Sequence, residues 1–351
     1  MKTLKNTLVS ALILTVIFIG ITNRDGASQT KGEVESFYKG KTVKLKIPYA
    51  PGGNADIWGR ALVPHLEKHL GAKIIVENVP GAGGLVGGAQ LYSLTKPDGL
   101  TVSIQLLTGL MLAEMLDLEA ARFELNKFTY IGRIDLAWRF LFASKASGFK
   151  TIRDMQKASK TIRFGATEKI SPSAADIAIM SEAFGLKSKI IPGYKATVEY
   201  VLATVAGREL DAISSIIVGC EDYAEKGDLV MVLIQGNKRS PDYPHVPAIS
   251  EIPTVNAEGK KLIEFLTALG EAGRLVLLAP PGVPEERRLF LDRALVNALK
   301  EPALLDWAKK NKAEPSPLSG KECKALVDRL TNLVPKAERP KFKHILTEKF
   351  F

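Results

Sequence analysis

Hydrophobic and polar residues follow two alternating periods along the chain. Residues 43–50 (VKLKIPYA) alternate as in a strand, while the apolar residues of 56–70 recur at helical spacing. The same succession follows as a strand over 73–77, a helix over 84–94 and a strand over 100–106. Strands and helices in alternation predict a parallel sheet covered by helices.

The alternation continues through the middle of the chain and recurs near its end. Further strands are predicted over 139–144, 161–166, 188–192, 210–217 and 274–279. Helices are predicted over 174–184 and 198–206, after Val218, and over 285–300 and 303–311. The late strand over 274–279 indicates that the chain returns to its first sheet. An inserted second lobe, joined by two connecting strands across a cleft, is how hinged binding proteins are built.

The N-terminus predicts export. Lys2 and Lys5 precede an apolar segment over 8–21, and small residues follow at 26–28. This pattern is typical of a signal peptide, predicted here over 1–28. The apolar segment is shorter than the roughly 20 residues that a spanning helix needs. We therefore expect a periplasmic protein whose first lobe comprises 39–138 plus 270–351 and whose inserted second lobe comprises 139–269.

Charge and cysteine content narrow the classes of partner. The formal net charge of +10 suits anionic small molecules or an anionic membrane surface, and it also fits a merely solvated basic surface. No nucleic acid is expected, because the basic residues are not interleaved with aromatic ones and no binding motif is present. Cys220 and Cys323 have no spacing signature, so either a disulfide or two buried free thiols is possible.

Motifs for catalysis, cofactors and metals are incomplete. The glycine cluster over 81–84 has no third glycine where a dinucleotide fingerprint requires one, and the P-loop-like 40–42 precedes a strand instead of following one. His65 and His69 lie four residues apart, but Glu67 is at the wrong offset for a zinc protease. There is no nucleophile elbow. We expect no catalytic residue, no cofactor and no metal.

Two strand-to-helix loops are candidates for binding an anion. Residues 51–54 (PGGN) lead from a strand into a helix, whose N-terminal amides and dipole favour a carboxylate. Asp56 either caps this loop or accepts from a ligand ammonium, and the loop is alternatively a simple tight turn. In the second lobe, hydroxyls at Thr167, Ser171 and Ser173 follow another strand. They either face the first loop across the cleft or cap the helix that follows.

Several ordered segments carry a family resemblance. They are FYKGKTVKLKIPYAPGGNADIWGRAL, IIVENVPGAGGLVGG, KPDGLTVSI, FGATEKISPSAA, GDLVMVLIQGNKRSPDYPHVPAISE and LLAPPGVPEERR. They are distributed along the chain from residue 37 to residue 288, so the likeness extends over nearly the whole mature chain. In these segments the chain resembles the extracytoplasmic substrate-binding receptors of tripartite tricarboxylate transporters, the Bug family.

The resemblance implies a two-lobed α/β fold of the type II periplasmic-binding-protein class, with a hinge and an interlobe cleft. It implies a monomeric receptor that binds a small carboxylate and delivers it to membrane permease subunits. The implied ligand-binding residues are Gly52, Gly53, Asn54, Asp56, Ala82, Gly83, Leu107, Thr108, Thr167, Ser171, Ser173 and Ser214. Ser214 and Ser215 stand where many relatives have an acidic or amide side chain. An exported enzyme acting on a carboxylate and a sensory receptor are the alternatives.

Overall fold

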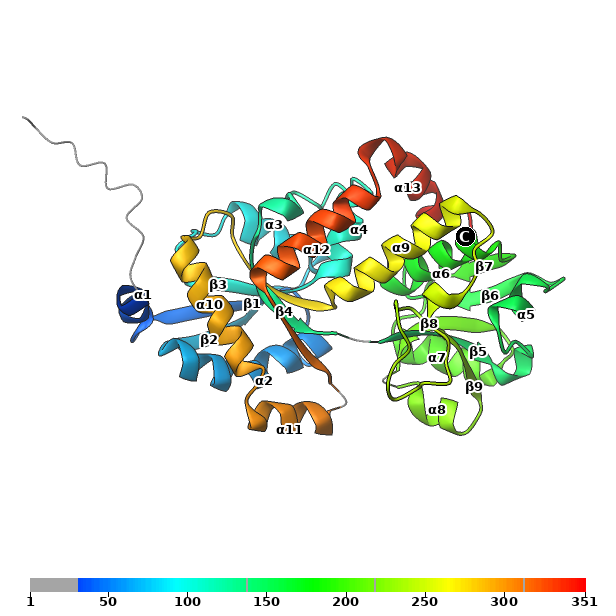
Figure 1. Cartoon of the computed structure of the whole chain (residues 1–351), viewed down its shortest axis with the longest axis horizontal. Helices are drawn as coiled ribbons and strands as arrows, with labels where there is room; N and C mark the ends of the chain where they lie inside the picture. The colour runs from blue at the N-terminus through cyan, green and yellow to red at the C-terminus, as the bar shows by residue number, and fades with distance from the viewer. Residues whose placement is uncertain (1–30, 137, 218, 312) are drawn as a thin grey trace, which may run out of the picture.

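The chain folds into two α/β lobes (Figure 1). The structure is a computed structural model that describes residues 31–351 except 137, 218 and 312. The predicted signal peptide, residues 1–28, lies outside the described residues. Within the described ranges, no helix combines the length and the apolar character needed to cross a membrane.

The first sheet has the strand order β11-β4-β10-β3-β1-β2. Its strands are β1 (Thr42–Ile47), β2 (Lys73–Asn78), β3 (Thr101–Leu106), β4 (Thr129–Asp135), β10 (Leu275–Ala279) and β11 (Pro315–Ser319). Strands β2, β1 and β3 are parallel, but β10 runs antiparallel to both β3 and β4. The prediction of a parallel sheet was therefore wrong for β10, because this strand enters the sheet on its return from the other lobe.

The second sheet repeats this arrangement. Its strands are β5 (Arg139–Ser144), β6 (Ile162–Gly165), β7 (Ser188–Ile191), β8 (Ala212–Ile216) and β9 (Leu229–Ile234). The order β7-β6-β8-β5-β9 matches β2-β1-β3-β10-β4, and β5 is the antiparallel member. In each lobe the chain crosses from one neighbour of the first parallel strand to the other, which creates a switch point at β1 and at β6.

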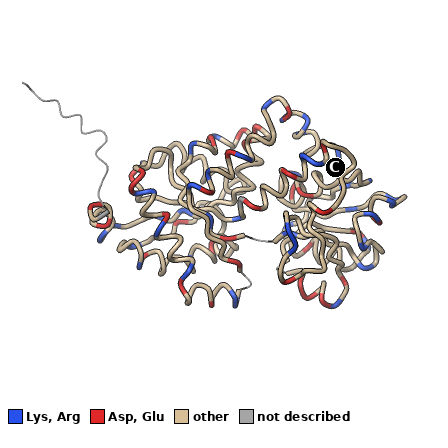
Figure 2. Tube along the Cα trace, in the orientation of Figure 1, with Lys and Arg blue, Asp and Glu red and all other residues tan. Residues whose placement is uncertain are grey.

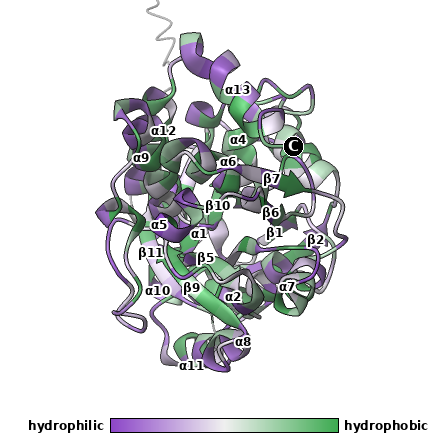
Figure 3. Ribbon diagram, turned by 90° about the vertical axis from the view of Figure 1, so that its right-hand side faces the viewer, coloured by the Kyte–Doolittle hydropathy of each residue, from purple (hydrophilic) through white to green (hydrophobic). Residues whose placement is uncertain are grey.

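Helices cover both faces of each sheet and form the connections. They are α1 (Lys31–Tyr38), α2 (Asn54–Leu70), α3 (Leu85–Ser93), α4 (Leu107–Met115), α5 (Ile152–Gln156), α6 (Pro172–Phe184), α7 (Thr197–Ala206), α8 (Glu221–Glu225), α9 (Ala257–Ala272), α10 (Glu285–Ala298), α11 (Pro302–Lys310), α12 (Gly320–Leu333) and α13 (Arg339–Thr347). One hydrophobic cluster extends through both lobes, with buried residues from α4, α6, α9 and α12. Figure 3 shows the hydrophobic strands of the second sheet. Charges of both signs are interspersed over both lobes (Figure 2).

Connections between the lobes differ in kind. The first leads from β4, which ends at Asp135, to β5, which begins at Arg139, whereas the second is helix α9, where a connecting strand was predicted. Helix α9 packs on α6 of the second lobe and on α12, which lies on β4 of the first.

The chain also returns to the second lobe at its C-terminal end. Helix α13 packs on α6, and the Ile190 N–H donates to the Phe350 carbonyl at 2.6 Å. The sequence-based division placed all of 270–351 in the first lobe. Residues 339–351 instead contact the second, because α12 ends at Leu333 and the chain turns toward α6.

Candidate functional site

The predicted residues of the first lobe lie at one edge of its sheet. Strands β1, β2 and β3 are parallel, and the chain leaves their carboxyl ends to enter α2, the short 3₁₀ helix Ala82–Gly84 with α3, and α4. A β-carbon at Gly109 would lie 4.0 Å from the Gly83 carbonyl oxygen, so the second and third loops touch. Gly52, Asn54, Ala82 and Gly83 are exposed, while Gly53 and Thr108 are half-buried.

The first loop is fixed by the carboxylate of Asp56, which is buried. Its Oδ2 accepts from the Gly52 N–H at 2.9 Å and from Arg60 Nε at 3.0 Å. Its Oδ1 accepts from Asn78 Nδ2 at 2.9 Å, and the same amide donates to the Tyr49 carbonyl at 3.1 Å. Of the two roles considered for Asp56, these bonds support the capping role, since both oxygens are occupied within the lobe.

The charge of Asp56 is stabilised by these donors. The Arg60 hydrogen bond, together with those of Gly52 and Asn78, lowers the pKa of Asp56 to about 2 against the opposing effect of burial. Gly53 is the N-cap of α2 in an extended conformation (φ −73°, ψ 164°), and it brings no side-chain acceptor. The first-turn N–H groups of α2 therefore have no side-chain acceptor from the N-cap and can donate to a ligand at this edge.

The second glycine cluster holds the loops close together. Ala82, Gly83 and Gly84 have φ of 44°, 64° and 96°, in the left-handed region that favours glycine. A β-carbon at Gly84 would lie 2.6 Å from Tyr49 Oη, which itself accepts from the Leu106 N–H at 3.0 Å. Burial raises the pKa of Tyr49. The phenol thus joins the first, second and third loops, and Gly84 makes room for it.

In the third loop, Leu107 and Thr108 were both predicted to bind the ligand, but they differ in burial. Leu107 is fully buried in the hydrophobic cluster, and its N–H donates to the Arg274 carbonyl at 3.2 Å. It is the first residue of α4, and its side chain belongs to the core and not to the exposed edge. Thr108, by contrast, is half-buried at the edge.

The second lobe presents hydroxyl groups at the start of α6. Ser171 is the N-cap: its Oγ accepts from the Ala174 N–H at 3.3 Å and donates to the Glu168 carbonyl at 2.9 Å. Ser173 Oγ lies 3.2 Å from Ser171 Oγ. Thr167 is half-buried, and its carbonyl accepts from the Gly193 N–H at 2.9 Å. Ser171 therefore caps the helix, as one interpretation proposed, and uses its hydroxyl in doing so.

Ser214 lies in a buried polar network that the sequence did not reveal. Its hydroxyl donates to Asp176 Oδ2 at 2.8 Å and accepts from Gln235 Nε2 at 2.8 Å and Arg139 Nη2 at 3.2 Å. Arg139 Nε also donates to Asp176 Oδ2 at 2.6 Å. Burial raises the pKa of Asp176, although Arg139 and Ser214 oppose this. No spacing rule could have found the network, because its members come from β5, α6, β8 and the end of β9.

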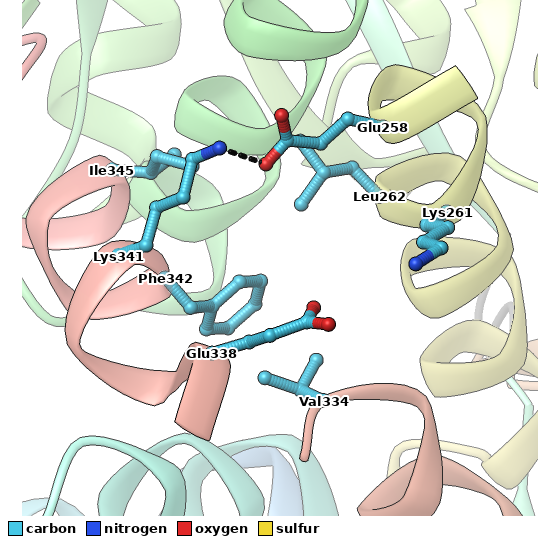
Figure 4. A pocket seen from close by; sticks show the side chains of 8 residues that line it. All are labelled: Glu258, Lys261, Leu262, Val334, Glu338, Lys341, Phe342 and Ile345. Carbon is cyan, nitrogen blue, oxygen red and sulfur yellow. Dashed lines mark ion pairs between the residues drawn. The ribbon is translucent and has the colours of Figure 1, made fainter. Parts of the chain in front are cut away.

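A pocket lies elsewhere, on the helical connection (Figure 4). It is lined by Glu258, Lys261 and Leu262 of α9, by Val334 and Glu338, and by Lys341, Phe342 and Ile345 of α13. An ion pair between Lys341 and Glu258 crosses it. None of the predicted binding residues lines this pocket.

The histidine pair of α2 contacts a carboxylate. His65 Nδ1 lies 2.7 Å from Glu301 Oε2, and His69 Nε2 and Lys68 Nζ lie 2.7 and 2.9 Å from Glu301 Oε1. Lys68, with His65 and His69, lowers the pKa of Glu301 to about 2. In the part of the chain that the structure describes, no group of three or more histidine, cysteine or acidic residues could hold a metal ion.

Both cysteines are free and buried. Burial raises the pKa of Cys220 to about 11 and that of Cys323 to about 12. Of the two possibilities left open by the sequence, the structure shows the buried thiols.

Comparisons with known proteins agree with this architecture. The profile of the tripartite tricarboxylate transporter family receptor (TctC) matches residues 59–332. A UPF0065 protein of Agrobacterium vitis is 24% identical over 317 residues, which cover 87% of this chain and 87% of that protein.

Two solved structures are similar in fold. A TctC solute binding protein from Polaromonas has a TM-score of 0.71 at 21% identity, over 89% of this chain and 100% of that one. MatC from Rhodopseudomonas palustris, with bound malate, has a TM-score of 0.60 at 22% identity, over 87% of this chain and 99% of that one. With two equivalent lobes and a profile match over most of its length, the chain belongs to the tripartite tricarboxylate transporter receptor family, whose members are solute-binding proteins.

Proposed function

We propose that this protein is a monomeric periplasmic receptor that captures a small carboxylate-bearing molecule without converting it, and delivers it to the permease subunits of a tripartite tricarboxylate-type transporter. The family match supports the receptor class, and the signal-peptide pattern at 1–28 supports export. MatC, a neighbour in fold, is described with malate.

One observation carries the proposal of an anionic ligand. Each lobe ends its first parallel strand, β1 or β6, at a switch point and then begins a helix, α2 or α6, whose N-terminus lies at that edge. A helix N-terminus stabilises an anion by about 0.3–1 kcal/mol at exposed sites, and by up to ~2 kcal/mol where it is partly buried. The α2 N-cap is a glycine, so a carboxylate can approach the amides directly.

The predicted residues divide according to their exposure. Gly52, Asn54, Ala82 and Gly83 are exposed and are proposed to contact the ligand directly. The half-buried residues Gly53, Thr108 and Thr167 are proposed to line the site. The buried residues Asp56, Leu107, Ser171, Ser173 and Ser214 are proposed to shape it from behind.

A panel of carboxylates tests the proposal by thermal shift and calorimetry on the mature chain. A ligand that binds only the folded state must raise the melting temperature. Gly53→Val is expected to abolish binding, because the added side chain lies at the α2 N-terminus. Its β-carbon would lie 3.2 Å from the Ala50 carbonyl oxygen, so the loop must shift slightly while the protein stays folded.

The matched control is Gly32→Val, where a β-carbon would have no neighbouring heavy atom within 4 Å. This variant is expected to bind like the parent. A panel in which no mono-, di- or tricarboxylate shifts the melting temperature would contradict the proposed function.

A further inference from the structure

A cationic side chain in the second lobe lies at the ligand edge of its sheet. Arg139 is the first residue of β5, and it pairs with Ile216, the last residue of β8. Strand β5 is antiparallel, so its first residue lies beside the carboxyl end of β8. This is also the edge at which β6 ends and α6 begins, since β6 and β8 are parallel.

The guanidinium group of Arg139 is held rigidly. Nε and Nη2 each lie 2.6 Å from Asp176 Oδ2, and Nη2 also donates to Ser214 Oγ at 3.2 Å. Asp176 follows Ser173 by three residues on α6, so the two share a helix face. The network therefore fixes the guanidinium group alongside the first turns of α6.

Two polar atoms of this network make no hydrogen bond to the described residues. The Arg139 side chain is 25% exposed, and Nη1 donates to none of the residues that the structure describes. Gln235 is 6% exposed, and its Oε1 is buried without a partner among those residues, although its Nε2 donates to Ser214. Within the described part of the chain, one guanidinium nitrogen of Arg139 and the amide oxygen of Gln235 are thus unpaired beside the same serine.

We propose that Arg139 is a ligand-binding residue of the second lobe that receives a second anionic group, so that the preferred ligand is a dicarboxylate. This inference rests on the proposed receptor function. A guanidinium edge matches a carboxylate in geometry, and a charge-assisted bond of this kind is stronger than a neutral one. The first lobe then binds one end of the ligand through backbone amides, and the second lobe binds the other through a side chain.

A second Asp–Arg pair in the same lobe provides a matched control. Arg163 Nε donates to Asp211 Oδ2 at 3.0 Å, and Asp211 is as buried as Asp176. Asp211 comes directly before β8, so this pair lies at the amino end, the opposite edge of the sheet. It is also an arginine–carboxylate ion pair, with Lys160 as a second partner of Asp211 at 2.9 Å, and it lies away from the proposed site.

The test compares ligands that differ by one carboxylate: succinate with butyrate, glutarate with pentanoate, and adipate with hexanoate. By calorimetry, the parent is expected to bind the dicarboxylate of at least one pair about tenfold or more tightly than the matching monocarboxylate.

The double variant Arg139→Gln/Asp176→Asn, which avoids an unpaired buried carboxylate, is expected to reduce this affinity ratio to about one. Its affinity for the monocarboxylate should stay within about twofold of the parent's. The control Arg163→Gln/Asp211→Asn is expected to keep the parent ratio.

Several results would overturn the assignment: a parent without preference for the dicarboxylate, or a double variant that keeps the preference. If the double variant fails to fold, Arg139→Lys keeps the charge but loses the planar fork, and the ratio is expected to fall severalfold; an unchanged ratio overturns the assignment as well. A parent that binds no carboxylate at all contradicts the proposed function itself, which is a distinguishable outcome.

Discussion

The β1–α2 loop and the β6–α6 loop occupy equivalent places in the two lobes but are built differently. In the first lobe, glycines leave the backbone open, and the loop is held from behind by Asp56, which binds Gly52, Arg60 and Asn78. In the second lobe, a serine side chain caps the helix, and the Arg139–Asp176 ion pair lies beside the first turns of that helix.

This difference separates two ways of binding an anion. The first loop offers main-chain donors whose position depends on one buried carboxylate. In the second loop, the Ser171 hydroxyl caps α6, and the guanidinium group of Arg139 lies at the same edge of the sheet. Sites that depend on backbone shape tolerate few changes of residue, whereas a side-chain contact can be exchanged when its buried partner is exchanged with it. Specificity within the family is therefore expected to vary more in the second lobe.

The largest expected effect comes from removing the carboxylate behind the first loop. Asp56→Ala leaves the Gly52 amide, Arg60 and Asn78 without their acceptor, and we expect unfolding to become easier by about 3 kcal/mol. Chemical denaturation measures this change. Asp306→Ala, an exposed acidic position on α11, serves as the control and should change stability by less than about 0.5 kcal/mol. Equal effects at both positions would contradict the anchoring role of Asp56.

The second glycine cluster tests whether backbone shape maintains the first lobe. Gly84→Ala combines a φ of 96° with a β-carbon 2.6 Å from Tyr49 Oη, so we expect a loss of about 2–3 kcal/mol. Gly83→Ala has a φ of 64° but no heavy atom within 4 Å of the added carbon, and should cost about 1 kcal/mol. Thermal unfolding of the two variants separates the cost of the contact with Tyr49, which only Gly84→Ala has, from the cost of a positive φ, which both have. If Gly83→Ala were the more damaging, the contact with Tyr49 would not matter.

Acid is expected to loosen the two lobes unequally. The folded state lowers the pKa of Asp56 from its ordinary value of 3.8 to about 2, so its stabilising contribution is present above about pH 4 and is lost as the pH falls toward 2. Burial raises the pKa of Asp176, so protonation there does not remove stability in the same range. Hydrogen exchange between pH 4 and 2 should show residues 50–56 losing protection before the start of α6, and the reverse order would contradict the comparison.

The smallest effect is expected at the cap of the second lobe. Ser171→Ala removes the acceptor of the Ala174 N–H, and should lower stability by about 1 kcal/mol. Ser171→Thr keeps the hydroxyl and should retain most of that stability. If Ser171→Ala instead abolished carboxylate binding with no loss of stability, the hydroxyl would be a direct ligand contact and not mainly a cap.

The predicted strands and helices were largely confirmed where one period dominates. The helix expected over 56–70 is α2, which begins at Asn54, and the strands expected over 73–77 and 139–144 are β2 and β5. Strand β4 was missed because buried polar residues interrupt its apolar pattern. Arg133 Nε donates to the Ser316 carbonyl at 2.7 Å, and the Leu275 N–H donates to Asp135 Oδ1 at 2.9 Å.

The candidate site was predictable only in part. The turn at Gly52 and Gly53 is local, since a strand, two glycines and a helix suffice to predict a helix N-terminus with open amides. The division of the twelve candidate residues into exposed and buried ones was not predictable, because it depends on packing between loops. Leu107 and Thr108 are neighbours in sequence, yet only Thr108 reaches the edge.

The sequence by itself determined the alternation of strands and helices, the glycine-rich turns and the family, because these depend on local spacing and on ordered motifs. The tertiary structure alone decided that β10 and β5 run antiparallel, that α9 joins the lobes, and that Arg139 meets Asp176, Ser214 and Gln235. The physical reason is that a buried charge needs partners from wherever the chain is near in space. Those partners come from segments whose separation along the sequence carries no periodic signal.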